Sequence, residues 1–276
     1  MFKKLIKKLL EKFNYRITKI KTLEPVIDCK IDTDFDNSKV LLNLGSGNWS
    51  CEGWINLDYP SAWYANAQKD HKIIPYDIRN DKIPFDDDSV DVIYCSHVVE
   101  HIENIYIQKM FTECYRVLKK GRGVRIACPD AEFLYQLSKF NNDYWSWRNE
   151  WFDSKHFYEK KFAPRNVDFF VREIATPKLL NYVNSINTED YETAFNKMEM
   201  YDFFEYLTKD LIFRVEAVGD HINYWTFDKA KKMLVESGFK TIIRSKWSAS
   251  VLEEMKNKSK FDIVYPHMSL YVEAIK

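Results

Sequence analysis

Two glycines and an acid follow short apolar runs near the start of the chain, and together they could bind a nucleoside-like ligand. Residues 40–44 are apolar apart from one asparagine and lead directly into Gly45-Ser46-Gly47. Glycine lacks a Cβ and tolerates positive φ, so the backbone at this turn can approach a ligand closely. The carboxylate of Asp58, at the end of the next predicted strand, can accept hydrogen bonds from ribose hydroxyls. This pattern predicts a nucleoside-type cofactor lying across the carboxyl ends of parallel strands.

The spacing of these residues argues against a dinucleotide. The dinucleotide fingerprint has a third glycine that opens a helix, and an acid about 20 residues further on. Here Ser50 occupies the position of the third glycine, and Asp58 follows Gly47 by only 11 residues. Residues 51–53 leave little room for a helix whose N-terminus would hold a pyrophosphate. A cofactor without a pyrophosphate needs no such helix.

Two further strands carry polar residues at their ends. Residues 72–78 predict a short strand that ends near Asp77. Residues 83–97 predict an acidic turn and a strand that ends at His97, and residues 98–102 predict the start of the following helix. The alternation of strands and helices favours a parallel sheet with helices on both faces.

With these segments the chain resembles the class I S-adenosylmethionine (SAM) dependent methyltransferases, and within them the small methyltransferases of bacterial surface-polysaccharide biosynthesis, such as capsule. The resemblance is clear over residues 39–130 and resumes, more weakly, from Gly219. The motifs that carry it are Leu44-Gly45-Ser46-Gly47, Gly53-Trp54-Ile55-Asn56-Leu57-Asp58, Tyr76-Asp77-Ile78, Phe85-Asp86-Asp87-Asp88-Ser89-Val90-Asp91 and Val99-Glu100-His101-Ile102.

The resemblance implies a Rossmann-like α/β fold with a seven-stranded, mostly parallel sheet. It implies SAM as the cofactor and S-adenosylhomocysteine as the product. The implied cofactor-binding residues are Asn43, Gly45, Ser46, Gly47, Asp58, Asp77, Ile78, Cys95, Ser96 and His97. No spacing of His, Cys or Asp resembles a metal site, so no metal is expected.

The chain divides into four predicted parts. An amphipathic helix and linker occupy residues 1–38, the SAM-binding core residues 39–130, a helical insertion residues 131–218, and the end of the core residues 219–276. Within the core we expect a helix over residues 106–118 ended by Gly121, and a fifth strand over residues 123–128. A helix over residues 227–237, capped by Thr226 and Gly238, precedes strands over residues 240–244 and 269–274.

The insertion is rich in aromatic residues and follows the fifth strand, where a substrate lid would lie. Trp147, Trp151 and Tyr224 are the candidates to contact the substrate, since aromatic faces stack on sugar rings. The alternative is that these aromatic residues fill the core of a helical subdomain or form a dimer interface.

Three residues are candidates to take a proton from an acceptor hydroxyl. His221 precedes the last long helix, where the resemblance places a histidine beside the acceptor, and an unperturbed pKa near 6.5 would suit a base at neutral pH. His97 lies at the cofactor edge and is the second candidate. Asp130 ends the fifth strand and could instead cap the next helix.

The leading function is O-methylation of a sugar, nucleotide-sugar or other surface-glycan precursor. An N-methyltransferase acting on a small amine is the alternative within the same fold. An NAD-dependent sugar epimerase or reductase would have a third glycine and a well-placed Tyr-x-x-x-Lys pair, and the pair from Tyr115 to Lys119 lies away from the predicted site. A non-catalytic partner subunit would not need Gly45, Gly47 and Asp58.

Composition restricts partners and compartment. Lysine plus arginine and aspartate plus glutamate number 41 each, which argues against a dedicated nucleic-acid binder. Five cysteines without a C-x-x-C pair indicate free thiols in a reducing compartment, so we expect a cytoplasmic protein. No apolar run approaches the 18 or so residues of a membrane span.

Residues 1–21 are the one strongly basic segment, with eight Lys or Arg and one Glu. Apolar residues recur in it at helical spacing. The segment could pack on this fold or on the second subunit of a homodimer. It could also lie on an anionic membrane surface, which would place the protein peripherally at the inner face of the membrane.

Overall fold

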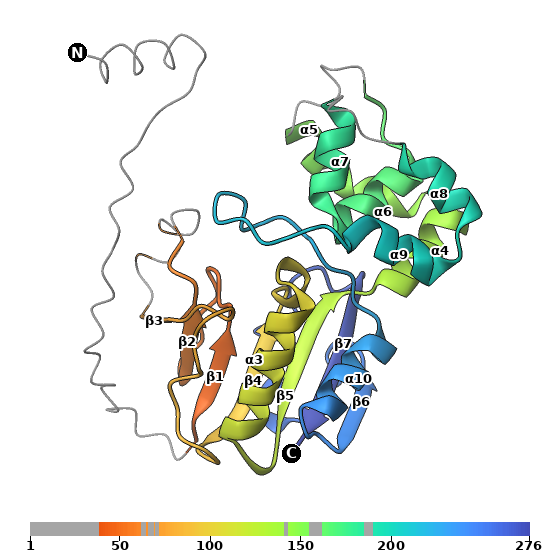
Figure 1. Cartoon of the computed structure of the whole chain (residues 1–276). Helices are drawn as coiled ribbons and strands as arrows, with labels where there is room; N and C mark the ends of the chain where they lie inside the picture. Colours follow the sequence, from red (N-terminus) through yellow and green to blue (C-terminus); the bar gives the residue numbers. More distant parts are fainter. Residues whose placement is uncertain are drawn as a thin grey trace, which may run out of the picture. The chain divides into compact units, whose positions relative to one another are not determined.

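A seven-stranded mixed sheet forms the framework of the protein. The computed structural model describes residues 39–61, 65, 69, 72–140, 143–154, 162–184 and 190–276, so the basic segment over residues 1–21 lies outside the described residues. The strands run in the order β3-β2-β1-β4-β5-β7-β6 (Figure 1). Their bounds are Leu41–Leu44 (β1), Trp54–Asp58 (β2), Ile73–Pro75 (β3), Val90–Ser96 (β4), Leu118–Pro129 (β5), Thr241–Ser245 (β6) and Ser269–Ile275 (β7).

The pairing confirms the predicted fold class. Strands β1 to β5 pair in parallel, whereas β7 runs antiparallel to both β5 and β6. Because parallel strands end at the same edge, the polar residues that follow β1, β2 and β4 are brought to one side of the sheet.

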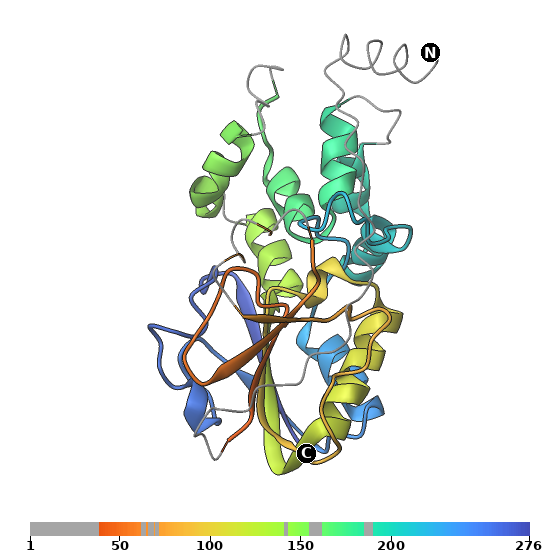
Figure 2. The same cartoon turned by 90° about the vertical axis from the view of Figure 1, so that its left-hand side faces the viewer.

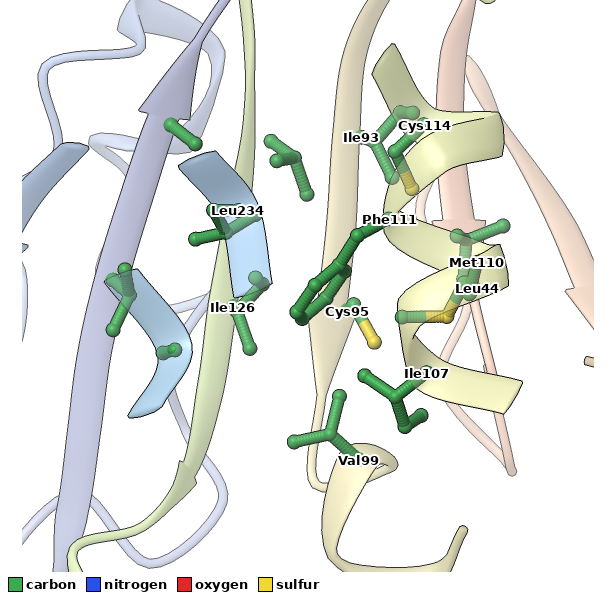
Figure 3. Packing of buried hydrophobic residues seen from close by; sticks show 14 of the residues in the cluster. Leu44, Ile93, Cys95, Val99, Ile107, Met110, Phe111, Cys114, Ile126 and Leu234 are labelled. Atoms are coloured by element: carbon green, nitrogen blue, oxygen red, sulfur yellow. The ribbon is translucent and has the colours of Figure 1, made fainter. Parts of the chain in front are cut away.

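Helices α3 (Asn104–Val117) and α10 (Phe227–Glu236) cover one face of this sheet. The apolar residues of α3 recur at intervals of three and four, which places them on one side of the helix. Figure 3 shows the resulting core of α3 side chains, strand side chains and one residue of α10: Ile107, Met110, Phe111 and Cys114 with Leu44, Ile93, Cys95 and Ile126, and Leu234.

On the opposite face, the described residues that cover β4 come from a long connection rather than from a long helix. In the described part of the chain, Val92 and Tyr94 of β4 are covered by Leu252, Met255 and Phe261. These residues belong to the connection between β6 and β7, which holds only one short 3₁₀ helix, Glu253–Met255. Among the described residues, apolar and aromatic side chains of this connection therefore cover part of this face.

The insertion after β5 is a helical layer with its own core. Its helices are α4 (Ala131–Phe140), α5 (Asn149–Ser154), α6 (Asn166–Ile174), α7 (Thr176–Val183), α8 (Tyr191–Lys197) and α9 (Met200–Thr208). Figures 1 and 2 show them beyond the end of β5, on the side where the parallel strands end. Buried aromatic side chains fill this layer: Trp145, Phe152, Phe169, Phe170, Phe203 and Phe204.

Local signals set most of the predicted boundaries. Thr226 accepts a hydrogen bond from the amide of Lys229 at 3.2 Å and caps α10, and Gly238 follows with a φ of +108°. The predicted end of α3 at Gly121 is wrong: the helix ends at Val117, and Gly121 lies inside β5. Its φ of +75° bends the strand instead of capping the helix. None of the described helices is long and apolar enough to cross a membrane.

Candidate active site

A cavity of about 250 Å³ opens at the carboxyl ends of β1, β2 and β4. It brings together nine of the ten residues predicted to bind the cofactor. These are Asn43, Gly45, Ser46, Gly47, Asp58, Asp77, Ile78, Ser96 and His97. Their common position follows from the parallel pairing, since each lies on or just beyond the end of its strand.

The turn after β1 needs glycine for two different reasons. Gly45 has a φ of +68°, and a Cβ on it would lie 2.3 Å from Cγ2 of Val98. Gly47 has a φ of +55°, but no described atom lies within 4 Å of the place where its Cβ would be. Gly45 therefore allows close packing within the protein, whereas Gly47 is favoured by its backbone conformation alone.

Asp58 ties this turn to the end of β2. Its carboxylate accepts hydrogen bonds from the amide of Gly47 at 2.6 Å and from the amide of Tyr59 at 2.7 Å. The side chain is almost fully buried but lines the cavity. A carboxylate oxygen can accept more than one hydrogen bond, so Asp58 can hold the turn and still meet a ligand hydroxyl.

Asp77 lies at the cavity wall beyond β3 and is held by Arg79. The Nε and Nη2 atoms of Arg79 donate to the two carboxylate oxygens at 2.9 and 2.7 Å. Burial raises the pKa of Asp77, but these hydrogen bonds outweigh it and leave the pKa below its usual value. The guanidinium also lies 4.1 Å from the ring centre of Phe213, which belongs to the loop after α9.

Cys95 does not lie on the cavity wall. Its side chain alternates with those of Tyr94 and Ser96 along β4 and points into the core beneath α3 (Figure 3). Burial raises the pKa of its thiol well above the usual value, so it stays protonated. The sequence places Cys95 at the right end of the strand, but the period of two turns it away from the cavity.

His97 lies on the cavity wall in an uncommon backbone conformation, with a φ of +54°. Its Nδ1 lies 3.0 Å from Oε1 of Glu100, and its Nε2 lies 2.9 Å from the hydroxyl of Ser269. Glu100 is fully buried. A buried carboxylate beside one ring nitrogen fixes the orientation of an imidazole, which suits a residue that exchanges protons through the other nitrogen.

His221 lies behind this wall rather than on it. Its Nδ1 is 2.6 Å from the carbonyl oxygen of Glu173, and its ring centre is 4.7 Å from that of His101, which does line the cavity. Burial, with a contribution from Arg172, lowers the pKa of His221 well below 6.5. The expectation of an unperturbed histidine at this position is therefore wrong, because the ring is enclosed by the insertion.

Asp130 has the geometry of a helix N-cap, the alternative to its role as a base. Its Oδ1 accepts a hydrogen bond from the amide of Phe133 at 3.1 Å, at the start of α4. Its Oδ2 accepts one from Arg244 at 3.0 Å. Asp130 is not among the cavity residues.

The three aromatic residues predicted to contact the substrate lie outside the cavity lining. Trp147 is half-buried. The centre of its ring lies 4.4 Å from the ring centre of His267 and 4.2 Å from the guanidinium carbon of Arg148. Trp151 is half-buried against the helical core, and Tyr224 is buried and donates a hydrogen bond to Glu205. In the described residues these side chains have the surroundings of core residues.

Other residues of the insertion region and of the β6–β7 connection line the cavity instead. They are Phe213, Val218, Ile263 and Val264. The sequence offers little signal for them, because each is an ordinary apolar residue in a loop. Tyr59 and Arg79 were also missed, although both directly follow a predicted motif and neighbouring positions could have been included.

Comparison with known proteins agrees with this architecture. Residues 53–124 match a family model described as a methyltransferase domain. The matched segment runs from the turn before β2 into β5 and includes Asp58, Asp77 and His97. The matched core has the Rossmann-like architecture of a methyltransferase domain.

Solved methyltransferase structures are similar to this chain at low sequence identity. A SAM-dependent methyltransferase from Archaeoglobus fulgidus is 13% identical, with a TM-score of 0.41 over 99% of this chain and 94% of that one. One from Mesorhizobium loti is 13% identical, with a TM-score of 0.41 over 86% and 90%. A possible histamine N-methyltransferase from Thermotoga maritima is 11% identical, with a TM-score of 0.40 over 87% and 83%. A comparison with curated proteins gave no match to the sequence.

The residues of this methyltransferase fit the cofactor that the fold implies. The open space beside Gly47 gives a ligand access to the backbone of the turn. Asp58 offers a buried carboxylate for ribose hydroxyls, and Ile78 offers an apolar side chain beside Asp77. These residues would hold SAM, and His97 and His101 then lie on the wall that remains for an acceptor.

Proposed function

We propose that this methyltransferase methylates a hydroxyl group of a sugar, nucleotide-sugar or other surface-glycan precursor. The observation that carries the proposal is the pair formed by His97 and the buried Glu100. A hydroxyl acceptor must lose its proton during methyl transfer, and a histidine paired with a carboxylate is suited to receive it. The sugar class rests on the resemblance of the sequence motifs.

Each residue has a part in this scheme. SAM supplies an electrophilic methyl group on a sulfonium. Gly45, Gly47 and Asp58 would position it, and positioning alone accounts for much of the rate in such transfers. Glu100 favours the His97 tautomer with its proton on Nδ1. Nε2 would then accept a proton from the acceptor in place of its contact with the Ser269 hydroxyl.

A methyl-transfer screen tests the proposal. The enzyme is incubated with SAM carrying a labelled methyl group and with panels of nucleotide sugars, free sugars and small amines. We expect label in a sugar-containing acceptor. Label in amines alone, or none in any acceptor although S-adenosylhomocysteine binds, would count against the proposal.

A variant pair tests the base. His97→Asn should lower kcat by about 10²–10⁴-fold while affinity for S-adenosylhomocysteine is kept. His267→Asn, a histidine outside the cavity lining, is the matched control and should keep the parental kcat. Parental kcat in His97→Asn would remove His97 from the mechanism.

A further inference from the structure

Glu100, His101 and His221 form a compact cluster behind the acceptor side of the cavity. One possible ligand atom from each residue lies within 4.8 Å of those of the other two. Glu100 and His101 belong to the 3₁₀ helix Val99–His101, and His221 belongs to the loop before α10. Two distant segments of the chain therefore meet at this point.

Both histidines are oriented for ligation through Nε2. The Nδ1 of His101 lies 2.9 Å from the carbonyl oxygen of Asp220, and the Nδ1 of His221 lies 2.6 Å from that of Glu173. A carbonyl oxygen can only accept, so each Nδ1 carries the proton and each Nε2 keeps its lone pair. Metal-bound histidines typically have this arrangement, with the second nitrogen donating to a carbonyl or carboxylate.

The third member of the cluster, Glu100, is a buried carboxylate with one oxygen that can still accept a ligand. Oε1 of Glu100 contacts His97, and Oε2 has no hydrogen-bond partner among the described residues. Leaving a carboxylate oxygen buried without a partner is costly, and a cation is one of the few groups that offset this cost.

The backbone around the cluster is held by hydrogen bonds between the two segments. The carbonyl of Glu100 accepts from the amides of Ile222 at 2.8 Å and Asn223 at 3.1 Å. The amide of His221 donates to the hydroxyl of Thr176 at 3.1 Å. These contacts hold the three ligands close together before any ion binds, as a metal site requires.

We propose that Glu100, His101 and His221 bind one divalent transition-metal ion, such as Zn²⁺, whose open coordination positions face the acceptor side of the cavity. Two imidazoles and one carboxylate form a ligand set for such ions, and three protein ligands leave positions open for a further oxygen. Ligand atoms around a bound ion stand roughly 3–4 Å apart, so binding requires the side chains to close by a modest amount.

One nearby charge opposes the ion. The guanidinium of Arg172 pairs with the carboxylate of Glu173 at 2.9 Å, and the carbonyl oxygen of the same Glu173 lies 2.6 Å from Nδ1 of His221. We therefore expect tighter binding when an oxygen-rich acceptor supplies a further negative or strongly polar ligand. That expected role rests on the proposed O-methylation, whereas binding of the metal itself does not.

Metal binding to the whole enzyme tests the site without any acceptor. Protein stripped with a chelator and dialysed is titrated with Zn²⁺ by calorimetry and with Co²⁺ by absorption. We expect one equivalent of each metal per chain. The Co²⁺ spectrum should lack the intense bands of thiolate ligation, and X-ray absorption should show about two imidazoles per Zn²⁺. Failure to take up an equivalent of either metal at micromolar concentrations, or thiolate bands, would overturn the proposal.

Single variants localise the site. Glu100→Gln and His221→Gln should each weaken Zn²⁺ binding by more than about 100-fold. His267→Gln should bind like the parent. Thermal unfolding and S-adenosylhomocysteine binding report whether each variant is folded; if neither cluster variant folds, the X-ray absorption result on the parent decides. Equal losses in all three variants would place the metal elsewhere. A positive metal result with a negative sugar screen would reject the acceptor class alone.

Discussion

The turn after β1 and the helical insertion are both predicted to contact ligands. In the structure the residues predicted in the turn line the cavity, whereas those predicted in the insertion do not. Gly45 and Gly47 of the turn reach the cavity, together with Asp58 at the end of β2, which holds the turn. In the insertion, Trp147 and Trp151 pack against other side chains of the helical layer, while the less conspicuous Phe213 reaches the cavity. The turn was predicted from residues whose type matters at a fixed backbone position, whereas the insertion was predicted from composition.

This difference has a physical cause. A strand end fixes where its neighbouring residues lie, because parallel strands finish at the same edge of the sheet. Aromatic content does not determine where a residue lies, because an aromatic ring is stabilised by packing against other rings as well as by contacting a ligand. Mutations of the predicted residues at strand ends should therefore change ligand binding, whereas mutations of the aromatic residues in the insertion should mainly change stability.

The largest effect is expected at Gly45. Gly45→Ala places a Cβ 2.3 Å from Val98 in a backbone region that alanine disfavours. We expect a loss of about 2–5 kcal/mol in the free energy of unfolding, together with loss of S-adenosylhomocysteine binding. Denaturant unfolding and calorimetric titration measure the two effects.

Gly47→Ala is the matched control for that change. Its Cβ meets no described atom, so the cost in stability should be only about 1–2 kcal/mol from the positive φ. Because Gly47 lines the cavity, the added methyl group should lower ligand binding nonetheless. If the two variants are equally stable, the contact between Gly45 and Val98 is not what requires glycine.

Asp58→Ala should weaken S-adenosylhomocysteine binding by about 1.5–3 kcal/mol, the range for hydrogen bonds to a charged group. Part of the loss will come from the turn itself, since the amide of Gly47 donates to this carboxylate. Asp58→Asn keeps one acceptor oxygen and should recover part of the affinity. Asp86→Ala, an exposed acid outside the cavity lining, serves as the control, and unchanged binding in Asp58→Ala would remove the ribose assignment.

The insertion provides the contrasting test. Trp147→Ala and Trp151→Ala should each lower the free energy of unfolding by about 1–3 kcal/mol, less than for a fully buried tryptophan. Acceptor KM should stay at the parental value. Phe213→Ala, on the cavity wall, should weaken cofactor or acceptor binding with a smaller effect on stability. A raised acceptor KM in the tryptophan variants, with parental stability, would restore them as substrate contacts.

The sequence predicted the strands of the core along the chain, the cavity edge and the cap of α10, because each depends on local pattern or on residues with a fixed backbone requirement. It did not predict that Cys95 turns away from the cavity, since that depends on the phase of side chains along β4. The meeting of Glu100, His101 and His221 was also hidden, because His221 lies more than a hundred residues from the other two and only tertiary packing brings them together. The spacing of His, Cys and Asp along the sequence cannot indicate such a cluster for this reason.

The last test concerns the junction between the core and the insertion, where Lys229 of α10 contacts the loop that follows the insertion. Its ammonium group donates to Oδ1 of Asn223 at 2.7 Å and to the carbonyl oxygen of Tyr224 at 2.8 Å. Burial lowers the pKa of Lys229 from 10.5 to about 7, despite the opposing influence of Glu205. In the unfolded chain the same group keeps its usual pKa.

The sign of the resulting pH dependence follows from proton counts. Between pH 7 and 10.5 the unfolded chain holds a proton on Lys229 that the folded protein has largely released, so this group makes stability rise with pH, by at most about 1.4 kcal/mol per pH unit. Below pH 7 both states hold the proton, and the contribution no longer changes. Lys229→Met should remove this rise, which is measured as the difference between parent and variant in denaturant unfolding from pH 7 to 9. Lys232→Met, on the same helix and exposed, should leave the parental slope. If the free energy of unfolding has the same pH dependence in the parent and in Lys229→Met, Lys229 is charged in the folded protein. A charged ammonium group, rather than a neutral amine, would then make the hydrogen bonds at this junction.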